Sequence, residues 1–180
     1  FGTGKAGNGF SFGTGAFAEA LVGGVRSPLL TQTDNFAFEG WLNWRGDSTS
    51  GQHQNVFYNG HSGFNGYGLS VKGSSNAVFP TGTTGELMVL IGGQATIASG
   101  VVLTTNQFTH IALVRNSAAL TLYVDGVAIP LSAPTPNTPA LVSGAGEGFL
   151  LSAAAPNSFN GTIDEFAVYA QPLTPSQVQS

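Results

Sequence analysis

Hydrophobic and polar residues alternate along several short stretches of the chain, as expected for β-strands with one buried face. Residues 36–45 read FAFEGWLNWR, which places Phe36, Phe38, Gly40, Leu42 and Trp44 on one face and Ala37, Glu39, Trp41, Asn43 and Arg45 on the other. The alternation returns at residues 67–71. Residues 87–91 are continuously apolar, which is typical of a strand covered on both faces. No apolar stripe of helical period occurs, so the pattern predicts a chain built of strands.

Two longer patterns follow in the last third of the chain. Residues 108–126, FTHIALVRNSAALTLYVDG, contain two apolar runs separated by Asn116–Ser117 and end in Asp125–Gly126. Asp-Gly is a strong turn signal because glycine accepts a positive φ without steric cost, so the segment predicts a hairpin. Residues 162–169 predict a closing strand. Its alternation puts Ile163, Glu165, Ala167 and Tyr169 opposite Thr162, Asp164, Phe166 and Val168.

Weaker apolar runs at residues 10–12, 56–58, 101–103 and 149–151 bring the total to roughly a dozen strands, which suits two packed sheets. The prolines of residues 130–139 cannot donate to a central ladder, so an exposed loop is expected there. Thr174 can cap a short helix that begins at Pro175, with Gln177 completing the capping box. We therefore expect an all-β, antiparallel two-sheet sandwich with one short C-terminal helix.

Composition narrows the class of protein. The 180 residues are the length of one domain, which we place at 1–180. Only 8% of residues are charged, against about 25% in ordinary soluble domains. The five basic residues are scattered, so nucleic acid is not an expected partner. The chain contains no run of about 18 apolar residues, so membrane insertion is not expected. Low charge without cysteine is typical of bacterial exported modules and virion proteins, so we expect an extracellular, secreted or virion-surface location.

Four motifs resemble one family. They are GKAGNGFSF at residues 4–12, FAFEGW at 36–41, the hairpin at 108–126, and FNGTIDEFAVYAQPLTPSQV at 159–178. In this order they are similar to the laminin G-like and concanavalin A-like lectin–glucanase jelly rolls, and the resemblance implies that fold. The chain departs from the family at Gly13, where an Asp is usual, and at Thr109, where the first of two His is usual.

The resemblance also implies a structural calcium as the one expected cofactor. Related jelly rolls often hold it partly through the Asp of the closing strand, which is Asp164 here. Calcium takes six to eight oxygen ligands, of which backbone carbonyls can supply several. The alternative is that Asp164 accepts hydrogen bonds from nearby backbone donors at the sheet edge.

Catalysis is not expected, although glucanases share this fold. A retaining glycosidase needs two carboxyl groups about 5 Å apart. The Glu-x-Asp-x-Glu pattern of the glucanases is missing, and the adjacent Asp164 and Glu165 point to opposite faces of a strand. The chain also lacks cysteine and a Gly-x-Ser-x-Gly elbow, and its three histidines have no metal-ligand spacing. A glycoside hydrolase whose distant carboxylates meet in space is a remote alternative.

Residues 44–67 combine aromatic, amide and imidazole side chains at unusual density. Sugar sites need an aromatic face for the ring and polar groups for the hydroxyls. The candidate ligand-binding residues are Trp44, Tyr58, His61, Asn65 and Tyr67. Each aromatic residue among them has an alternative role as a strand residue that faces the core.

We therefore expect a non-catalytic carbohydrate-binding, lectin-like module of a larger exported protein. Its partner would be a glycan or cell-surface polysaccharide that is neutral or weakly polar, because few charges are present to meet sulfates or uronates. The alternative is a structural or adhesion module of a phage virion or a bacterial surface protein. The low charge and the Ser-, Thr- and Asn-rich composition suit both hypotheses.

Overall fold

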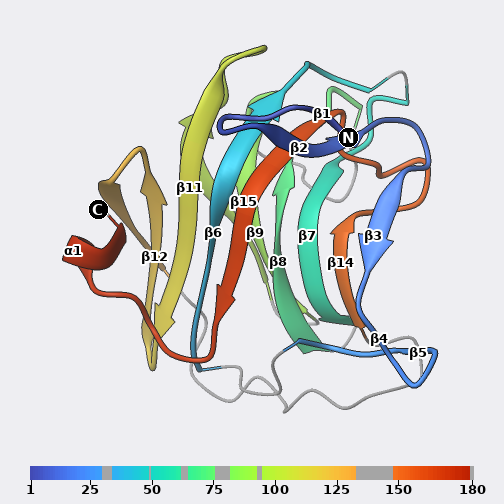
Figure 1. The fold of residues 1–180 in the computed structure, drawn as a ribbon. Coiled ribbons are helices and arrows are strands. Elements are labelled where there is room, and N and C mark those ends of the chain that lie inside the picture. Colours follow the sequence, from blue (N-terminus) through green and yellow to red (C-terminus); the bar gives the residue numbers. More distant parts are fainter. Residues whose placement is uncertain are drawn as a thin grey trace.

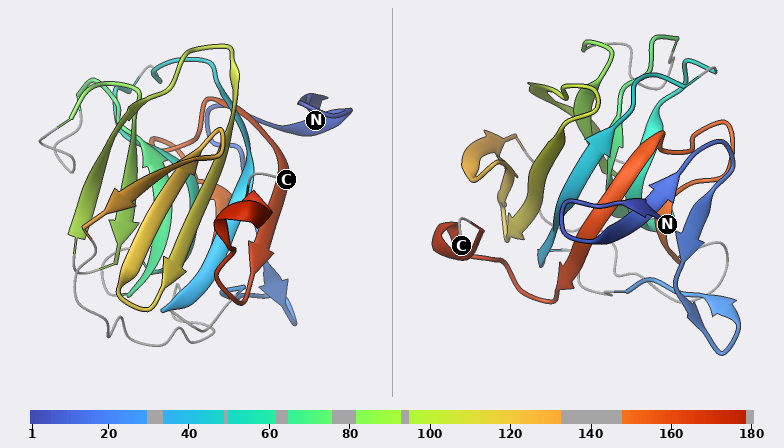
Figure 2. Two further views of the ribbon diagram at one scale, coloured as in Figure 1. Left: turned by 90° about the vertical axis from the view of Figure 1, so that its left-hand side faces the viewer. Right: turned by 45° about the horizontal axis from the view of Figure 1, so that its top comes forward.

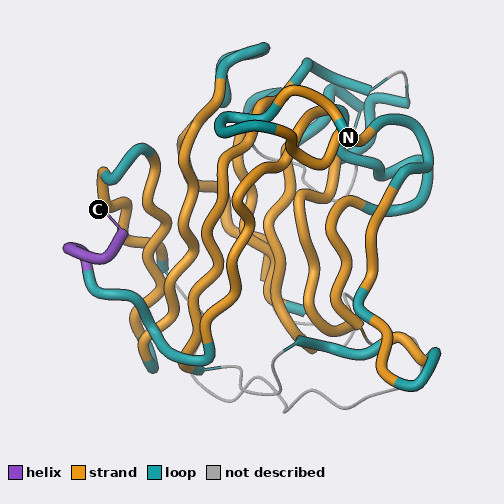
Figure 3. Tube along the Cα trace, viewed as in Figure 1, coloured by secondary structure: helices purple, strands orange, loops and turns teal. Residues whose placement is uncertain are grey.

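The computed structural model describes residues 1–29, 34–48, 50–61, 65–75, 82–92, 95–132 and 148–178. Its strands form two packed sheets, and all paired strands within them are antiparallel (Figures 1 and 3). The predicted fold class, an all-β sandwich with one short helix, is confirmed.

The first sheet has seven strands, in the order β1 (Gly2–Thr3), β2 (Asn8–Phe12), β15 (Gly161–Tyr169), β6 (Asn35–Trp44), β11 (Phe108–Asn116), β12 (Ala119–Val124) and β13 (Val127–Leu131). The second has six, in the order β10 (Ala95–Val102), β9 (Glu86–Ile91), β8 (Asn65–Val71), β7 (Gln54–His61), β14 (Gly148–Ser152) and β3 (Phe17–Glu19). A separate hairpin joins β4 (Leu21–Val22) to β5 (Val25–Arg26).

Strand β6 is the centre of the first sheet and follows the alternation of its sequence. Phe36, Phe38 and Leu42 are buried in the core between the sheets, whereas Glu39 and Trp41 face outward and are partly exposed. Across the core, the ring of Phe36 stacks on Tyr67 of β8 with 3.7 Å between centroids. β6 therefore supplies part of the core with one face and leaves the other face to neighbouring segments.

The predicted hairpin is confirmed as β11 and β12, which pair from Ile111–Val124 to Asn116–Ala119. The turn that follows joins β12 to β13 through Asp125 and Gly126, whose φ angles are 48° and 78°. Two consecutive positive φ angles are what a two-residue hairpin turn of type I′ requires. The turn ends directly beside His110, because the backbone N–H of Asp125 donates to the His110 carbonyl at 2.9 Å.

Strand β15 departs from the predicted alternation. Asp164 pairs with Trp41, but the next paired residue is Ala167, which lies opposite Glu39. Three steps along β15 thus match two along β6, which is a β-bulge with one extra residue. Glu165 takes φ 48° in this bulge. The alternation predicted within residues 165–169 holds, but its relation to the first part of the strand is wrong: Phe166 and Val168 pack against the core with Ile163, and Ala167 lies on the outer face.

The prediction of a loop over residues 130–139 is wrong at its start. Pro130 lies within β13 and pairs with Thr121. β13 is the last strand of its sheet, and proline is tolerated in an edge strand because no further strand needs its missing N–H group. Residues 133–139 lie outside the described part of the chain.

The predicted C-terminal helix is confirmed as α1 (Pro175–Val178). The backbone N–H of Thr174 donates to Oε1 of Gln177 at 2.8 Å, as a capping box requires. Val178 and Leu173 pack on Ala37, Ala112, Val114 and Tyr123 of the outer face. The C-terminal segment therefore covers part of the first sheet from outside (Figure 2). No helix of the described chain is long and apolar enough to cross a membrane.

The first prediction concerns the aromatic core. Phe38 is 1% exposed, and its ring lies 4.6 Å from that of Phe57 across the sandwich. We expect Phe38→Ala to lower the free energy of unfolding by about 3–5 kcal/mol, because truncating a buried phenylalanine leaves a cavity. Urea denaturation measures this loss. The control is Phe10→Ala, whose ring is 43% exposed and whose loss is expected to cost under about 1 kcal/mol. Equal losses in the two variants would contradict the assigned core.

Candidate functional site

A groove with a volume of about 720 Å³ lies on the outer face of the first sheet. β6, β11 and β15 form its floor, the β12–β13 turn forms one wall, and α1 forms another. Ala167 is a small residue on this floor, and the C-terminal segment closes one side by packing on Ala37 and Ala112. The larger lining residues are Glu39, Trp41, His110, Asp125, Val127, Glu165, Tyr169, Gln177 and Val178.

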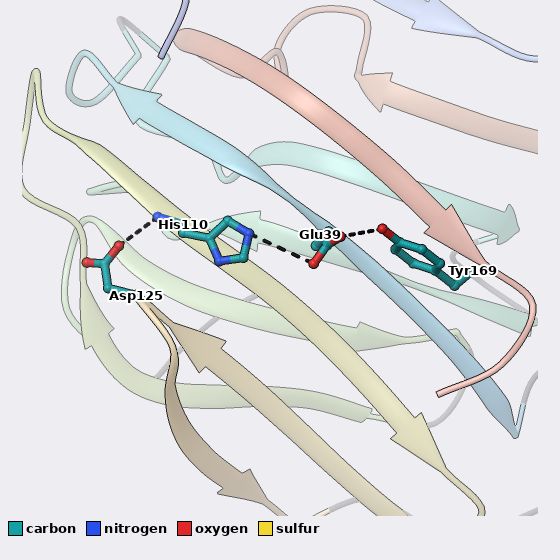
Figure 4. A network of polar contacts seen from close by, with 4 residues as sticks. All are labelled: Glu39, His110, Asp125 and Tyr169. Atoms are coloured by element: carbon teal, nitrogen blue, oxygen red, sulfur yellow. Dashed lines mark hydrogen bonds and ion pairs between the residues drawn. The ribbon is translucent and has the colours of Figure 1, made fainter. Parts of the chain in front are cut away.

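Glu39 is the centre of a polar network on this floor (Figure 4). The hydroxyl of Tyr169 donates to its Oε1 atom, and Nε2 of His110 lies 4.0 Å from its Oε2 atom. The hydrogen bond to the Glu39 carboxylate, with burial and the negative charge of Glu39 in support, raises the pKa of Tyr169 above its ordinary value. The three side chains come from three adjacent strands, so the network fixes Glu39 across the sheet.

His110 is held at its backbone as well. Its N–H group donates to Oδ1 of Asp125 at 2.8 Å, and its carbonyl accepts from the Asp125 N–H. Asp125 therefore fastens the β12–β13 turn to β11, and the turn forms the wall of the groove beside the imidazole (Figure 4).

Trp41 is the aromatic residue at the end of the groove near the N-terminal segment. It pairs with His110 on one side and with Asp164 on the other. The His110 ring lies 5.1 Å from the indole, tilted by 55°. The ammonium group of Lys5 lies 4.5 Å from the centroid of the indole. Because Trp41 is partly exposed, its indole is accessible at the surface of the groove.

Three carboxylates, those of Glu39, Asp125 and Glu165, line the groove. Among the described residues of its walls and floor there is no lysine or arginine. Glu165 is exposed and takes its position from the β-bulge, whereas Glu39 and Asp125 come from β6 and the β12–β13 turn. An indole beside several hydrogen-bond acceptors suits a small ligand with an apolar face and hydroxyl donors.

Asp164 lies next to the groove and accepts three backbone hydrogen bonds. Its Oδ2 atom accepts from Lys5 at 2.8 Å and from Ala6 at 3.0 Å, and its Oδ1 atom accepts from Glu165 at 3.0 Å. This is the alternative role of Asp164, in which it satisfies backbone donors.

The surroundings of Asp164 do not fit a calcium ion. N–H groups face its oxygens, where a calcium ion would require further oxygen ligands. Within the described ranges, no group of three or more histidine, aspartate or glutamate side chains could hold a metal. The calcium suggested by the family resemblance therefore stays a prediction without support from this geometry.

The candidate residues from the 44–67 region lie elsewhere. Tyr58, His61, Asn65 and Tyr67 belong to the β7–β8 hairpin of the second sheet. The Tyr58 hydroxyl donates to the Asn65 carbonyl at 2.8 Å, and Oδ1 of Asn65 accepts from the His61 N–H at 3.0 Å. Three of the candidates are thus brought together, and ligand binding by them stays a prediction.

The other two aromatic candidates take the alternative role of core residues. Tyr67 is fully buried, and this burial raises the pKa of its phenol. Its hydroxyl accepts a hydrogen bond from Nδ2 of Asn59 at 3.3 Å. Trp44 is 5% exposed, and its indole N–H donates to Gln54 at 3.3 Å. Gln54 begins β7 and His61 ends it. Trp44 therefore contacts the end of β7 that is opposite to His61.

The loop part of the same region lines a second, smaller depression of about 380 Å³. Its lining residues are Gly13, Thr14, Asp47, Ser48, Ser50, Ala155, Pro156, Ser158 and Asn160. Several of these side chains bond to neighbouring loops: Ser50 donates to the Pro156 carbonyl, and Asp47 accepts from the N–H of Ser74. The depression is therefore mainly a gap between loops that are hydrogen-bonded to one another.

None of the residues that line the larger groove is among the candidates predicted from the sequence. One signal was present: the alternation of residues 36–45 already placed Glu39 and Trp41 together on the face opposite the core residues. His110 and Tyr169 join them only through the pairing of β11 and β15 with β6. The local density of aromatic and amide residues points instead to residues 44–67, none of which lines this groove, and ligand binding there stays a prediction.

Comparison with known proteins agrees with the fold. The family model of the concanavalin A-like lectin/glucanases superfamily matches residues 20–179. No curated protein matches the chain in sequence.

Three solved structures illustrate the likeness. Domain 4 of AbnA, a GH43 extracellular arabinanase from Geobacillus stearothermophilus solved with arabinotriose, is 25% identical; the match covers 93% of this chain and 80% of that one, with TM-score 0.59. A candidate carbohydrate-binding protein from Bacteroides ovatus is 18% identical; the match covers 94% of this chain and 45% of that one, with TM-score 0.71. Trypanosoma rangeli sialidase is 19% identical, with 81% and 22% covered and TM-score 0.55, so this chain spans about a fifth of that enzyme.

The second prediction tests Asp164 as a structural acceptor. We expect Asp164→Asn to lower the free energy of unfolding by about 2–4 kcal/mol, since hydrogen bonds to a charged group contribute about 1.5–3 kcal/mol each and the amide keeps only part of them. The matched control is Asp125→Asn, an exposed residue with one such bond, for which a loss below about 2 kcal/mol is expected. Chemical denaturation provides both values, and a neutral effect at Asp164 would refute the role.

The wild-type protein and the Asp164→Asn variant also test whether calcium binds at this residue. Because N–H groups already face Asp164, we expect the wild-type melting temperature to be the same in calcium chloride and in EDTA. A rise with calcium that Asp164→Asn abolishes would instead place the ion at this residue.

Proposed function

Because the chain belongs to the concanavalin A-like lectin/glucanase superfamily, we propose that it is a non-catalytic carbohydrate-binding, lectin-like module of an exported protein. The glycan binds in the groove on the outer face of the first sheet. The observation that carries the proposal is the combination, in one groove, of the Trp41 indole with the polar side chains of Glu39, His110 and Tyr169.

The groove has the chemistry and the size of a small-ligand site. Its volume of about 720 Å³ is within the usual range of about 300–1,000 Å³ for such sites. An indole face can pack on the C–H surface of a sugar ring, while carboxylates, imidazole and the Gln177 amide exchange hydrogen bonds with ring hydroxyls. The network holds Glu39, His110 and Tyr169 in place before a ligand arrives, which lowers the entropy cost of binding.

Similarity to a sugar-bound domain supports the ligand class. Domain 4 of the Geobacillus arabinanase is matched over most of both chains, and its structure is a complex with arabinotriose. Arabinotriose is a neutral oligosaccharide. A neutral ligand also agrees with the three carboxylates of the groove, which would repel sulfates and uronates.

The non-catalytic part of the proposal rests on how the carboxylates are used. Of the carboxylates in the groove, Glu39 is bound by Tyr169 and lies near His110, and Asp125 accepts the backbone N–H of His110. Both groups are thereby occupied in holding the structure. A hydrolase requires one carboxyl group to act as an acid while a second acts as nucleophile or base.

The third prediction is that Trp41→Ala weakens arabinotriose binding at least tenfold, because truncating a central aromatic contact costs about 2 kcal/mol or more. Isothermal titration calorimetry with arabinotriose and with polygalacturonate, a polyanion, measures affinity and selectivity. The wild-type protein is expected to bind the neutral sugar and not the polyanion.

Two variants serve as controls. Phe10→Ala removes an aromatic ring that is exposed outside the groove, so its affinity is expected to be that of the wild type. His61→Ala tests the hairpin site suggested by the sequence. Loss of binding in His61→Ala with normal binding in Trp41→Ala would move the site to the β7–β8 hairpin, and no loss in either variant would remove the proposal.

The fourth prediction is that the protein releases no reducing ends from arabinan, xylan or β-glucan. The measurement is a reducing-sugar assay after prolonged incubation, with a known glycosidase as positive control. Release that disappears in Glu39→Gln would show a hydrolase whose carboxylates meet only in the folded chain, and the non-catalytic assignment would then be withdrawn.

A further inference from the structure

The N-terminal turn, residues 4–7, lies beside Trp41 at the edge of the groove. Lys5 extends from this turn and places its ammonium group 4.5 Å from the centroid of the Trp41 indole. A cation at this distance is attracted by the negative face of the ring. Lys5 therefore covers one face of Trp41, which lines the end of the groove, while Lys5 itself is not one of the lining residues.

The turn is built to hold this position. β1 and β2 pair through Gly2–Gly9 and Thr3–Asn8, and the N–H of Gly4 donates to the Gly7 carbonyl at 3.0 Å. The Asp164 carboxylate then binds the N–H groups of Lys5 and Ala6. A Cβ atom on Gly4 would lie 2.4 Å from Oδ2 of Asp164, so the close approach of the turn requires glycine.

Trp41 has neighbours on both sides in the sheet. Its strand neighbours are His110, whose ring lies 5.1 Å away, and Asp164, which carries the turn. The Lys5 side chain is itself exposed and is tied to the ring by the cation–π contact. The backbone of the turn is thus fixed, whereas the ammonium group at its tip can move away.

We infer that Lys5 is a displaceable cap on the Trp41 platform and that it limits the affinity of the groove for neutral sugars. The inference rests on the proposed function. A sugar ring that stacks on this indole face replaces the ammonium group, so the cation–π contact is lost when the ligand binds. Asp164 acts as a positioning residue, because it keeps the turn in place and has no contact with the ligand in this arrangement.

The expected effect of removing the cap is an increase in affinity. An exposed cation–π contact of the usual strength corresponds to about a two- to fivefold change in an equilibrium constant. Lys5→Gln removes the charge and keeps a side chain of similar length. It is therefore expected to bind arabinotriose about two- to fivefold more tightly than the wild type.

Two measurements test the cap on the intact chain. Titration calorimetry with arabinotriose gives the affinity, and acrylamide quenching of tryptophan fluorescence without ligand reports how open the indole is. The chain has two tryptophans, and Trp44 is buried, so Trp41 dominates the quenching. Lys5→Gln is expected to give a steeper quenching slope than the wild type. The charge-matched control is Arg26→Gln in the β4–β5 hairpin, outside the groove, which should change neither quantity.

The outcomes separate the two proposals. Tighter binding together with steeper quenching in Lys5→Gln supports the cap; weaker or unchanged binding, or unchanged quenching, overturns it. Asp164→Asn should reproduce the steeper quenching, with a lower melting temperature that Lys5→Gln does not share. If none of the proteins binds a glycan, the proposed function fails, and the quenching result alone decides whether Lys5 covers Trp41.

Discussion

The register of β6 is the constraint on which both the core and the groove depend. β6 pairs with β11 over nine residues and with β15 on its other side. Its alternation sends Phe36, Phe38 and Leu42 inward and Glu39 and Trp41 outward. A slip of one residue would bury the charge of Glu39 and expose three large apolar side chains. The burial of the aromatic core therefore also fixes the positions of the polar groups of the groove.

The bulge in β15 adapts the neighbouring strand to this register. One extra residue lets Ile163 and Phe166 both face the core while Asp164 and Ala167 both face outward. Opposite the bulge lies Gly40, where a Cβ atom would come within 3.2–3.3 Å of Asp164 and Phe166. A small residue on β6 thus accommodates the extra residue on β15. As a result, Glu165 reaches the groove and Asp164 stays beside the N-terminal turn.

Sequence patterns predicted the fold well because the relevant signals are local. Alternation identified β6, and the Asp125–Gly126 pair identified the β12–β13 turn through the positive φ angles that glycine and aspartate tolerate. The bulge was not predictable in this way, since Glu165 takes a positive φ that no residue preference indicates. Its conformation follows from the packing of Phe166 between the sheets.

The site was harder to predict because its parts are far apart along the chain. Trp41 and Trp44 are both on β6 but point to opposite faces of the sheet. Trp41 therefore lines the groove, whereas Trp44 belongs to the core. The choice of residues 44–67 followed residue density, whereas the groove collects a few residues each from β6, β11, the β12–β13 turn, β15 and α1.

The environment of Asp164 shows why a motif that resembles a calcium ligand can have another physical role. A buried carboxylate needs positive partners, and these can be a cation or several oriented N–H groups. Here the glycine-rich turn supplies two N–H groups and the bulge supplies a third. Because the Asp164 carboxylate needs these donors, it connects the N-terminal segment with the closing strand. The same contacts set how close Lys5 lies to Trp41, so the carboxylate influences the surface of the groove while itself remaining buried.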